Sequence, residues 1–407
     1  MKIALITSKY PRLNGTFIQR EINGLKNAGA KITIFPLYDV DKALFNNKNV
    51  LSTFENEQVE WCKIVDCRFL SLRYFIGFLK FFKSVSYDYE ILKIISAYYK
   101  SGFLDFLKFL YSLPKIFYWE KKIKESSHIL SFWGNYSATA SYILSKNLNI
   151  PYSTYLHAGT DLYRKQTYLF QKLILAKRII CVCDFNRKFI KKLYPKYYNK
   201  LKNKIIIHHL GLDLKKMIAV PLNEKDEKFR VCFVGALEEY KGPMYILEAF
   251  KMFIENHKGH IYLCGEGSLK IKLKNYVEKN NLTNHVSFMG NCSNELVNRT
   301  ISRCHTLVHA SPYIGDAVPT VIKEAMSLSR AVIATEVAGI PELVCNDESG
   351  VIIPPQNTHA IAKNFENLHL DRAKCKKMGE KGRHISQIKF NLWKNTKILF
   401  NELYKFI

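Results

Sequence analysis

The beginning of the chain alternates short apolar runs with a longer periodic segment, and this order constrains the fold more than any other feature. Residues 2–7 predict a strand, residues 17–28 a helix that ends before Gly29, and residues 31–37 a second strand. The turn between the first strand and the helix holds Gly15. A strand, a helix and a strand in this order form a βαβ unit with parallel strands. The sequence therefore predicts an α/β fold.

The same alternation recurs twice along the 407 residues. Further strands are predicted in the N-terminal half at 129–133, 152–156, 179–183 and 205–208, and in the C-terminal half at 230–235, 260–264, 286–289, 306–309 and 331–335. We therefore expect two doubly wound, Rossmann-like domains that face each other across a cleft. A ligand is expected in that cleft, at the carboxyl ends of the strands.

The composition sets the expected boundaries of these domains. A polar, charged stretch at 214–228 predicts a linker between an N-terminal domain, 1–213, and a C-terminal domain, 229–385. Residues 386–407 predict a C-terminal helix, for which we consider packing back onto the N-terminal domain.

The charge of the chain points to anionic partners. Lys and Arg number 61 against 35 Asp and Glu, a formal net charge of +26. Such an excess favours nucleic acid, a phospholipid surface or phosphorylated small molecules. An AT-rich genome is a second explanation, because Lys, Asn, Ile, Phe and Tyr are all abundant. The basic residues are scattered and form no known nucleic-acid-binding motif, so we expect no nucleic acid partner.

Cysteines and apolar segments indicate a cytoplasmic location. The ten cysteines form no paired CxxC units, so we expect no zinc site and reduced thiols. We find no targeting segment and no uncharged apolar run of about 18 residues that would cross a membrane. Two aromatic, basic stretches, 69–83 and 101–119, suit a membrane interface or, alternatively, helices packed on the N-terminal sheet. Peripheral attachment to the inner face of the cytoplasmic membrane is therefore a candidate property.

The segment 315–326 is the most informative for chemistry. Pro319 predicts the first turn of a helix, whose backbone N–H groups at Thr320 and Val321 would seat a phosphate. Glu324 lies one turn further on the same face, where its carboxylate can accept hydrogen bonds from a ribose diol. Asp316, in the loop before the helix, can bind sugar hydroxyls. An ordinary loop and helix with a solvated aspartate is the alternative.

This segment resembles the signature of the retaining glycosyltransferases of family 4, which have the GT-B fold. That signature is two acidic residues separated by seven positions and followed by Ala, here Asp316, Glu324 and Ala325. The resemblance continues through 234–242, 264–267, 286–290 and 338–342. It implies donor-binding positions at Gly235, Lys241, Gly265, Gly267, Met289, Asp316, Ala317, Val318, Thr320, Val321 and Glu324.

Two positions depart from the family pattern. Ala236 stands where the family usually has an Arg that binds the donor diphosphate together with Lys, so that here only Lys241 is left. Asp316 stands where the family usually has Glu, so sugar contacts would shift by about 1 Å, the length of one methylene.

The N-terminal half resembles the family more loosely. Gly15 and Thr16 match the first βα turn, whose backbone approaches the donor phosphate and the acceptor; only Gly permits such an approach. His157 lies in a loop that resembles the family's His-bearing loop and would point at the reacting sugar; a buried, satisfied histidine is the alternative. The form of both loops resembles exopolysaccharide and lipopolysaccharide enzymes, including the colanic acid type.

The resemblance implies a retaining, hexosyltransferase-type enzyme. Its donor would be a nucleotide-diphosphate sugar and its acceptor a glycan or lipid-linked glycan of a cell-surface polysaccharide, with no metal or cofactor. His157, Lys241, Asp316 and Glu324 would be the catalytic residues. Lys241 and the helix N-terminus would stabilise the departing diphosphate, which would itself act as base for same-face attack. The alternatives are a catalytically weak GT-B scaffold or regulator, suggested by Ala236 and Asp316, and a GT-B sugar-nucleotide epimerase.

Overall fold

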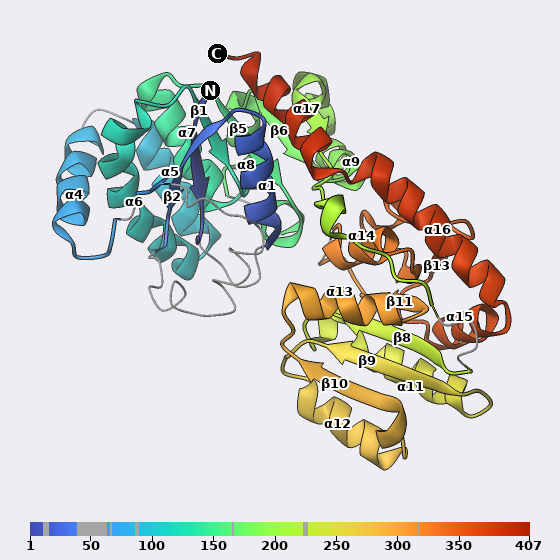
Figure 1. Cartoon of the computed structure of the whole chain (residues 1–407). Coiled ribbons are helices and arrows are strands. Elements are labelled where there is room, and N and C mark those ends of the chain that lie inside the picture. The colour runs from blue at the N-terminus through green and yellow to red at the C-terminus, as the bar shows by residue number, and fades with distance from the viewer. Residues whose placement is uncertain are drawn as a thin grey trace. The chain divides into compact units, whose positions relative to one another are not determined.

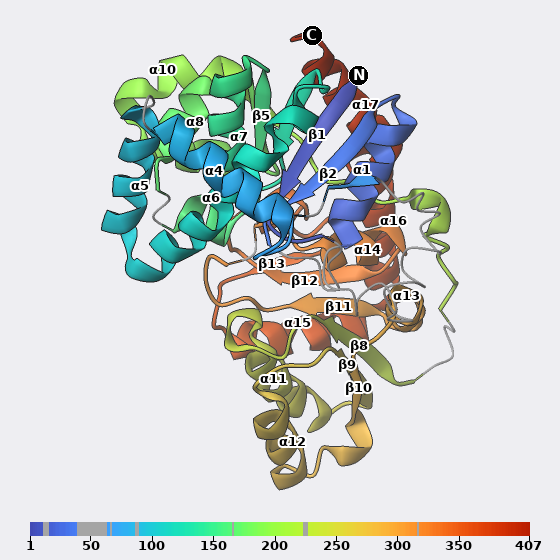
Figure 2. The same ribbon diagram turned by 90° about the vertical axis from the view of Figure 1, so that its left-hand side faces the viewer.

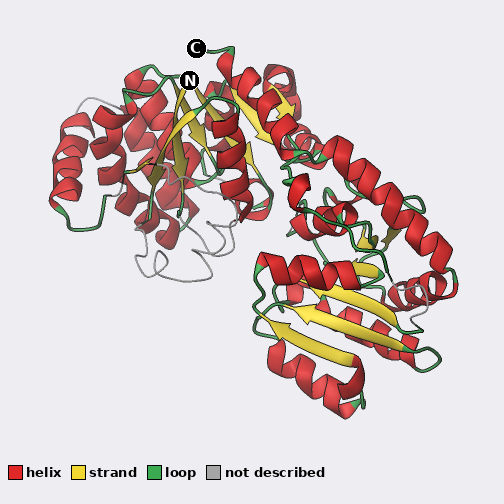
Figure 3. Ribbon diagram, in the orientation of Figure 1, coloured by secondary structure: helices red, strands yellow, loops and turns green. Residues whose placement is uncertain are grey.

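The computed structural model describes residues 1–10, 16–38, 63–65, 67–85, 89–164, 167–222, 227–315 and 317–407. The chain forms two compact units: unit 1 comprises 1–210 and 393–407, and unit 2 comprises 211–392. Each contains a parallel sheet with helices on its faces (Figure 3). In the described ranges, every helix is too short or too polar to cross a lipid bilayer.

Unit 1 contains a sheet in the order β3-β2-β1-β4-β5-β6-β7 (Figure 1). Its described strands are β1 (Lys2–Thr7), β2 (Lys31–Pro36), β3 (Lys63–Ile64), β4 (His128–Ser131), β5 (Tyr152–Leu156), β6 (Arg178–Cys181) and β7 (Ile205–Ile207). All their pairings are parallel. Strands β4 and β5 are buried along their whole length, as expected for strands covered by helices on both faces.

The helices of unit 1 follow its strands along the chain. Those described are α1 (Thr16–Asn27), α4 (Leu72–Val85), α5 (Tyr89–Ser101), α6 (Phe103–Ile123), α7 (Tyr136–Leu148), α8 (Leu169–Leu175), α9 (Asp184–Leu193) and α10 (Tyr198–Leu201). The stretches predicted at 69–83 and 101–119 become α4 and α6. Both helices begin later than predicted, because Leu70 and Gly102 have positive φ angles of 56° and 142° that a helix cannot contain.

Unit 2 contains the second sheet, in the order β10-β9-β8-β11-β12-β13 (Figure 2). Its described strands are β8 (Phe229–Val234), β9 (Gly259–Cys264), β10 (Val286–Gly290), β11 (Thr306–His309), β12 (Ala331–Thr335) and β13 (Val351–Ile353). The helices are α11 (Pro243–Ile254), α12 (Lys270–Lys279), α13 (Asn294–Arg303), α14 (Thr320–Ser327), α15 (Thr358–Leu370) and α16 (Arg372–Lys389). The predicted α/β class with two parallel sheets is confirmed.

The ends of unit 2 differ from the composition-based boundaries. The segment 214–228 lies within unit 2 as far as it is described, and Met217 packs into the core of that unit. Helix α17 (Leu392–Tyr404) returns the chain to unit 1, because all of its residues after Leu392 cluster there. There Glu402 forms an ion pair with Arg178 at 2.8 Å. The last helix therefore packs onto the N-terminal sheet domain, and this ion pair is a specific polar contact between them.

Candidate active site

The loops after β8 and β9 are joined by backbone hydrogen bonds at the carboxyl edge of the sheet in unit 2. The amide of Gly235 donates to the carbonyl of Cys264 at 3.0 Å, and that of Leu237 to Glu266 at 2.9 Å. The amide of Gly265 then donates to Gly290, the last residue of β10, at 2.9 Å. Three adjacent strand ends are thereby held together. Because the strands are parallel, this is the edge where α/β sheets bind ligands.

Glycine is required where these loops meet. A Cβ atom on Gly265, which has φ +148°, would lie 1.9 Å from the carbonyl oxygen of Gly235. A Cβ on Gly267 would lie 2.4 Å from the carbonyl oxygen of Leu237. Both distances are far below van der Waals contact, so no other residue fits without moving backbone. The sequence motif at 264–267 therefore has a steric cause.

Lys241 lies on the same loop system. It ends the short 3-10 turn Glu239–Lys241, and Gly242 follows in the left-handed conformation with φ 68°. The side chain is half-buried, and its Cγ and Cδ would be 3.8 Å from a Cβ on Gly235. Its Nζ lies 5.5 Å from the ring centroid of Tyr240. The structure thus brings Lys241 beside Gly235.

The end of this loop is fixed against the strand that leads to the acidic segment. A Cβ on Gly242 would lie 2.0 Å from the carbonyl oxygen of Ala310, the residue after β11. The loop that contains Lys241 is therefore in backbone contact with Ala310, at the start of the loop that leads to the 315–326 segment. This contact joins two parts of the site that are about 70 positions apart in the sequence.

Glu238 stabilises the loop pair and was not singled out from the sequence. Its carboxylate accepts hydrogen bonds from the amide and the hydroxyl of Ser268, at 2.7 and 2.6 Å. The Ser268 hydroxyl and then the Ser268 amide lower the pKa of Glu238, although the side chain remains open to solvent. The sequence signal for this contact is the glutamate of the Val-Gly-x-x-Glu segment, together with the serine that follows the Gly-acid-Gly turn.

The segment after β11 differs from the prediction at Pro319. This residue is the N-cap of α14, with φ −60° and ψ 122°, rather than part of its first turn. The extended ψ angle places it outside the helix, and its side chain makes no capping hydrogen bond. The first N–H groups of α14, which begins with Thr320 and Val321, thus point out of the helix without a side-chain cap. An uncapped N-terminus of this kind can receive an anion.

The other predicted residues of this segment lie around that helix start. Ala317 is buried, and its carbonyl accepts a hydrogen bond from the Gly339 amide at 3.0 Å. Val318 is half-buried between it and the helix. Thr320 and Glu324 are half-buried, one turn apart on α14, and so lie on one face.

Not every predicted site residue can be placed. Met289 lies half-buried in β10, next to the Gly290 that closes the loop system. Asp316 and Gly15 lie outside the described residues, so their predicted contacts stay predictions. Thr16 is the first residue of α1 in unit 1.

His157 follows β5 in unit 1 and is buried among aromatic rings. Its ring centroid lies 4.6 Å from that of Trp133 and 5.6 Å from that of Phe17. Its Nε2 donates to the carbonyl of Phe132 at 2.9 Å, and its amide donates to Asp161 at 3.1 Å. The imidazole is therefore held in one orientation by the protein, as the buried, satisfied alternative expects.

A buried acidic network near His157 was not found from the sequence. Glu21 of α1 accepts hydrogen bonds from the hydroxyl of Tyr155 and from Nε2 of His208, both at 2.6 Å. Burial by itself raises the pKa of Glu21, but the charge of His208 and these two hydrogen bonds hold it below its ordinary value. The network connects α1 to the ends of β5 and β7. These segments are so far apart in the sequence that local patterns could not predict the contact.

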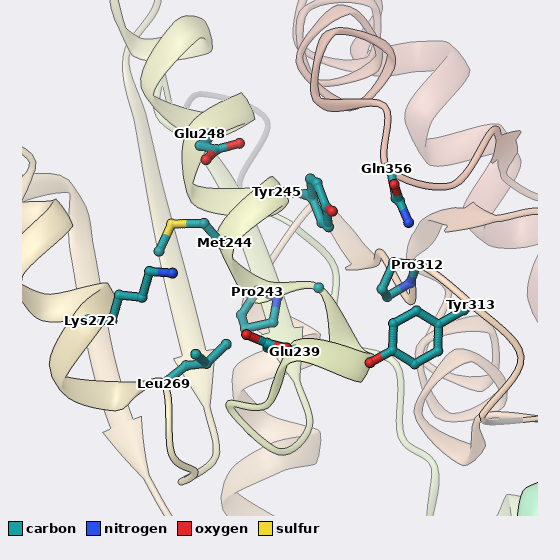
Figure 4. A pocket seen from close by; sticks show the side chains of 11 residues that line it. Glu239, Pro243, Met244, Tyr245, Glu248, Leu269, Lys272, Pro312, Tyr313 and Gln356 are labelled. Atoms are coloured by element: carbon teal, nitrogen blue, oxygen red, sulfur yellow. The ribbon is translucent and has the colours of Figure 1, made fainter.

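A pocket of about 370 Å³ lies in unit 2 beside the loop that carries Lys241 (Figure 4). It lies between the start of α11, the start of α12 and the loop after β11. Its lining includes two tyrosines, two carboxylates, an amide and a lysine: Tyr245, Tyr313, Glu239, Glu248, Gln356 and Lys272. In the described part of the chain, the predicted donor residues lie outside this lining.

The sequence of unit 2 matches a known protein family. Residues 215–385, nearly all of unit 2, match the family of group 1 glycosyl transferases. An uncharacterized glycosyltransferase of Methanocaldococcus jannaschii is 28% identical over 314 residues, which are 76% of this chain and 78% of that protein. The amylovoran biosynthesis glycosyltransferase AmsK of Erwinia amylovora is 25% identical over 164 residues, which are 39% of this chain and 40% of that protein.

The fold comparison covers the whole chain. The solved structure of Anabaena Alr3699/HepE in complex with UDP matches with a TM-score of 0.74 at 14% identity and covers 100% of both chains. At this identity the likeness establishes the fold, which is GT-B, and nothing about the substrate. Residues 215–385 therefore match the group 1 glycosyl transferases, and the whole chain shares the GT-B fold.

Proposed function

We propose that this chain is a retaining, hexosyltransferase-type glycosyltransferase. It would move a sugar from a nucleotide-diphosphate donor to a glycan or lipid-linked glycan in cell-surface polysaccharide biosynthesis. The observation that carries the proposal is the interlocked loop system of unit 2, in which Gly235, Lys241, Gly265 and the start of α14 share one sheet edge. Glycine loops and an uncapped helix N-terminus are what a diphosphate requires.

The proposed chemistry begins with the leaving group. As the glycosidic bond breaks, negative charge builds on the nucleoside diphosphate. The Lys241 ammonium and the N–H groups at Thr320 and Val321 would stabilise that charge, and most of the rate enhancement would come from such preorganised groups. In this proposal no metal or cofactor takes part.

The remaining site residues would orient the donor. Glu324 would accept hydrogen bonds from the ribose diol, Asp316 would contact hydroxyls of the transferred sugar, and Met289 would lie beside the base. His157 would lie beside the reacting sugar, with its ring fixed through the Phe132 carbonyl. The departing phosphate would serve as base for attack on the same face, so that the anomeric configuration is retained.

The names of similar proteins support the choice of donor and pathway. HepE was solved in complex with UDP and also with UDP-glucose. AmsK is named for the biosynthesis of amylovoran. A uridine diphosphate sugar and an extracellular polysaccharide are therefore the first donor and product class to test.

Calorimetric titration with UDP, GDP, ADP and dTDP tests the proposal, with donor hydrolysis and transfer measured in parallel. Lys241→Ala should weaken nucleoside diphosphate binding and lower kcat/KM by about two orders of magnitude, as loss of one transition-state donor does. Lys274→Ala, at an exposed position of α12, is the matched control and should behave as the wild type. Ala236→Arg should tighten diphosphate binding by restoring the cation that the family usually has.

The same titration decides the main alternative. Wild-type affinity and turnover in Lys241→Ala would place the diphosphate elsewhere and refute the site. A chain that binds a nucleoside diphosphate but neither hydrolyses nor transfers any sugar would instead be a GT-B scaffold or regulator, the reading that Ala236 favours.

A further inference from the structure

Helix α4 lies on the outer side of α6 in unit 1, and α6 separates it from the sheet (Figure 1). The Tyr74 hydroxyl donates to the carbonyl of Tyr111 at 3.2 Å. A Cβ on Gly77 would lie 1.8 Å from the carbonyl oxygen of Pro114, so the two helices touch along their backbones. Phe81 packs on Phe117, with ring centroids 5.7 Å apart. One face of α4 is thus fully used for packing within unit 1.

The opposite face of α4 exposes large apolar side chains. They follow at helical spacing, and the turn before the helix continues them. Between 41% and 81% of each of these side chains is exposed: Leu70, Leu72, Phe75, Phe78, Leu79 and Phe82. We name these six residues the α4 surface. Exposed apolar residues that occur singly are ordinary, but a contiguous set of this size indicates an interaction site.

The charges around the α4 surface identify the kind of partner. Arg73, Lys80 and Lys83 are exposed on the same helix, and the sequence has no Asp or Glu between residues 67 and 85. An apolar stripe of Phe and Leu beside Lys and Arg is the composition of helices that lie in a membrane interface. A second copy of the same surface would bring cations against cations, which disfavours a symmetric dimer through this face.

We propose that the α4 surface seats the chain on an anionic phospholipid membrane. Phe75, Phe78, Leu79 and Phe82 would enter the boundary between head groups and acyl chains, while Lys80 and Lys83 would meet the phosphates. Helix α4 would lie in the plane of the interface, since no helix in the described part of the chain can cross a bilayer. The inference goes beyond the proposed function and would keep the enzyme at the surface where a lipid-linked acceptor is located.

Vesicle binding of the full chain tests this surface. The probes are vesicles of phosphatidylcholine alone and of phosphatidylcholine with phosphatidylglycerol, followed by co-sedimentation at low and high salt. The wild type should bind the anionic vesicles more tightly by about tenfold or more, and salt should weaken that binding because it screens the charges. Phe78→Ser with Phe82→Ser should lower the partition constant by about tenfold by removing two rings from the interface.

A pair of charge-reversal variants tests the electrostatic contribution to vesicle binding. Lys80→Glu with Lys83→Glu should lower binding to anionic vesicles by about tenfold or more and leave binding to neutral vesicles unchanged. The matched control is Ile271→Ser with Lys274→Glu on α12, a helix of unit 2 on which Ile271 is 73% exposed. These exposed positions tolerate change, and far-ultraviolet circular dichroism checks that each variant remains folded.

Three results would overturn the proposal. The wild type could bind anionic and neutral vesicles equally, or both α4 variants could bind as the wild type does. Alternatively, the α4 variants could change the oligomeric state while the wild type ignores vesicles, which would assign the surface to contact between copies. The vesicle assay does not measure turnover, so a negative result leaves the transferase proposal unaffected. Conversely, a chain that fails to bind nucleoside diphosphates leaves the membrane proposal unaffected.

Discussion

Substitution of Gly265 by Ala should damage the donor site far more than its single methyl group suggests. The residue has φ +148°, and an added Cβ would lie 1.9 Å from the carbonyl oxygen of Gly235. Real Cβ contacts essentially never fall below 3.0 Å, so the two loops must separate by about 3.0 − 1.9 = 1.1 Å. The loops after β8 and β9 cannot both keep their places.

The magnitude follows from what this separation breaks. The Gly235–Cys264 and Gly265–Gly290 hydrogen bonds, at 3.0 and 2.9 Å, run beside the clash. Their loss costs about 1–3 kcal/mol together. The unfavourable backbone conformation of an alanine adds about 1–3 kcal/mol. A displacement of about 1 Å at groups that position a substrate lowers turnover by about a hundredfold.

Gly102→Ala is the matched control. Gly102 has φ +142°, close to that of Gly265, but an added Cβ would meet nothing within 4 Å. It lies between α5 and α6 of unit 1, so it belongs to neither of the two loops that meet at Gly265. The control therefore carries the backbone strain, about 1–3 kcal/mol, without the clash.

Two measurements on both variants separate the effect of the backbone clash from that of backbone strain. Urea denaturation followed by circular dichroism reports the free energy of unfolding, and calorimetric titration with UDP reports the site. Gly265→Ala should lose about 2–6 kcal/mol of the free energy of unfolding and most of its nucleotide affinity. Gly102→Ala should bind as the wild type does. If the two variants lose equal stability and bind UDP equally well, the interlocked loops are not what builds the site.

Two further predictions use other parts of the chain. Glu324→Gln should remain folded and lose donor affinity by about 1.5–3 kcal/mol, because it removes a charged hydrogen-bond acceptor; unchanged affinity and turnover would refute the ribose assignment. His128 is fully buried, and burial lowers its pKa from 6.5 to about 4. Below pH 6.5 the imidazole therefore binds a proton in the unfolded chain but stays neutral in the folded chain. The free energy of unfolding should fall by about 3 kcal/mol as the pH is lowered from 6.5 to 4. Above pH 6.5 this group should make no contribution to the pH dependence. His128→Gln should flatten the pH dependence of urea denaturation in that window, and an unchanged slope would contradict the assignment.

The class of the fold and most of its strands follow from local patterns in the sequence. The strands predicted at 152–156, 306–309 and 331–335 match β5, β11 and β12 residue for residue. Such strands could be predicted because each is a short run that contains β-branched or aromatic residues and lies between turn segments, a property of neighbouring residues alone. The glycine motifs at 235 and 265–267 could likewise be read from the sequence, although the functions assigned to them stay predictions.

Features that depend on partners distant in the chain become visible only in the folded protein. Strands β3 and β13 have two and three residues and exist only because they pair with β2 and β12. The Glu21–His208 hydrogen bond joins residues 187 positions apart, and the exposure of Phe78 depends on which face of α4 meets α6. Periodicity reports the preference of a single segment, whereas strand order and helix packing determine which segments meet. Only the folded chain could therefore show the buried acidic network, the contact that makes Gly265 necessary and the apolar face that is left open to water.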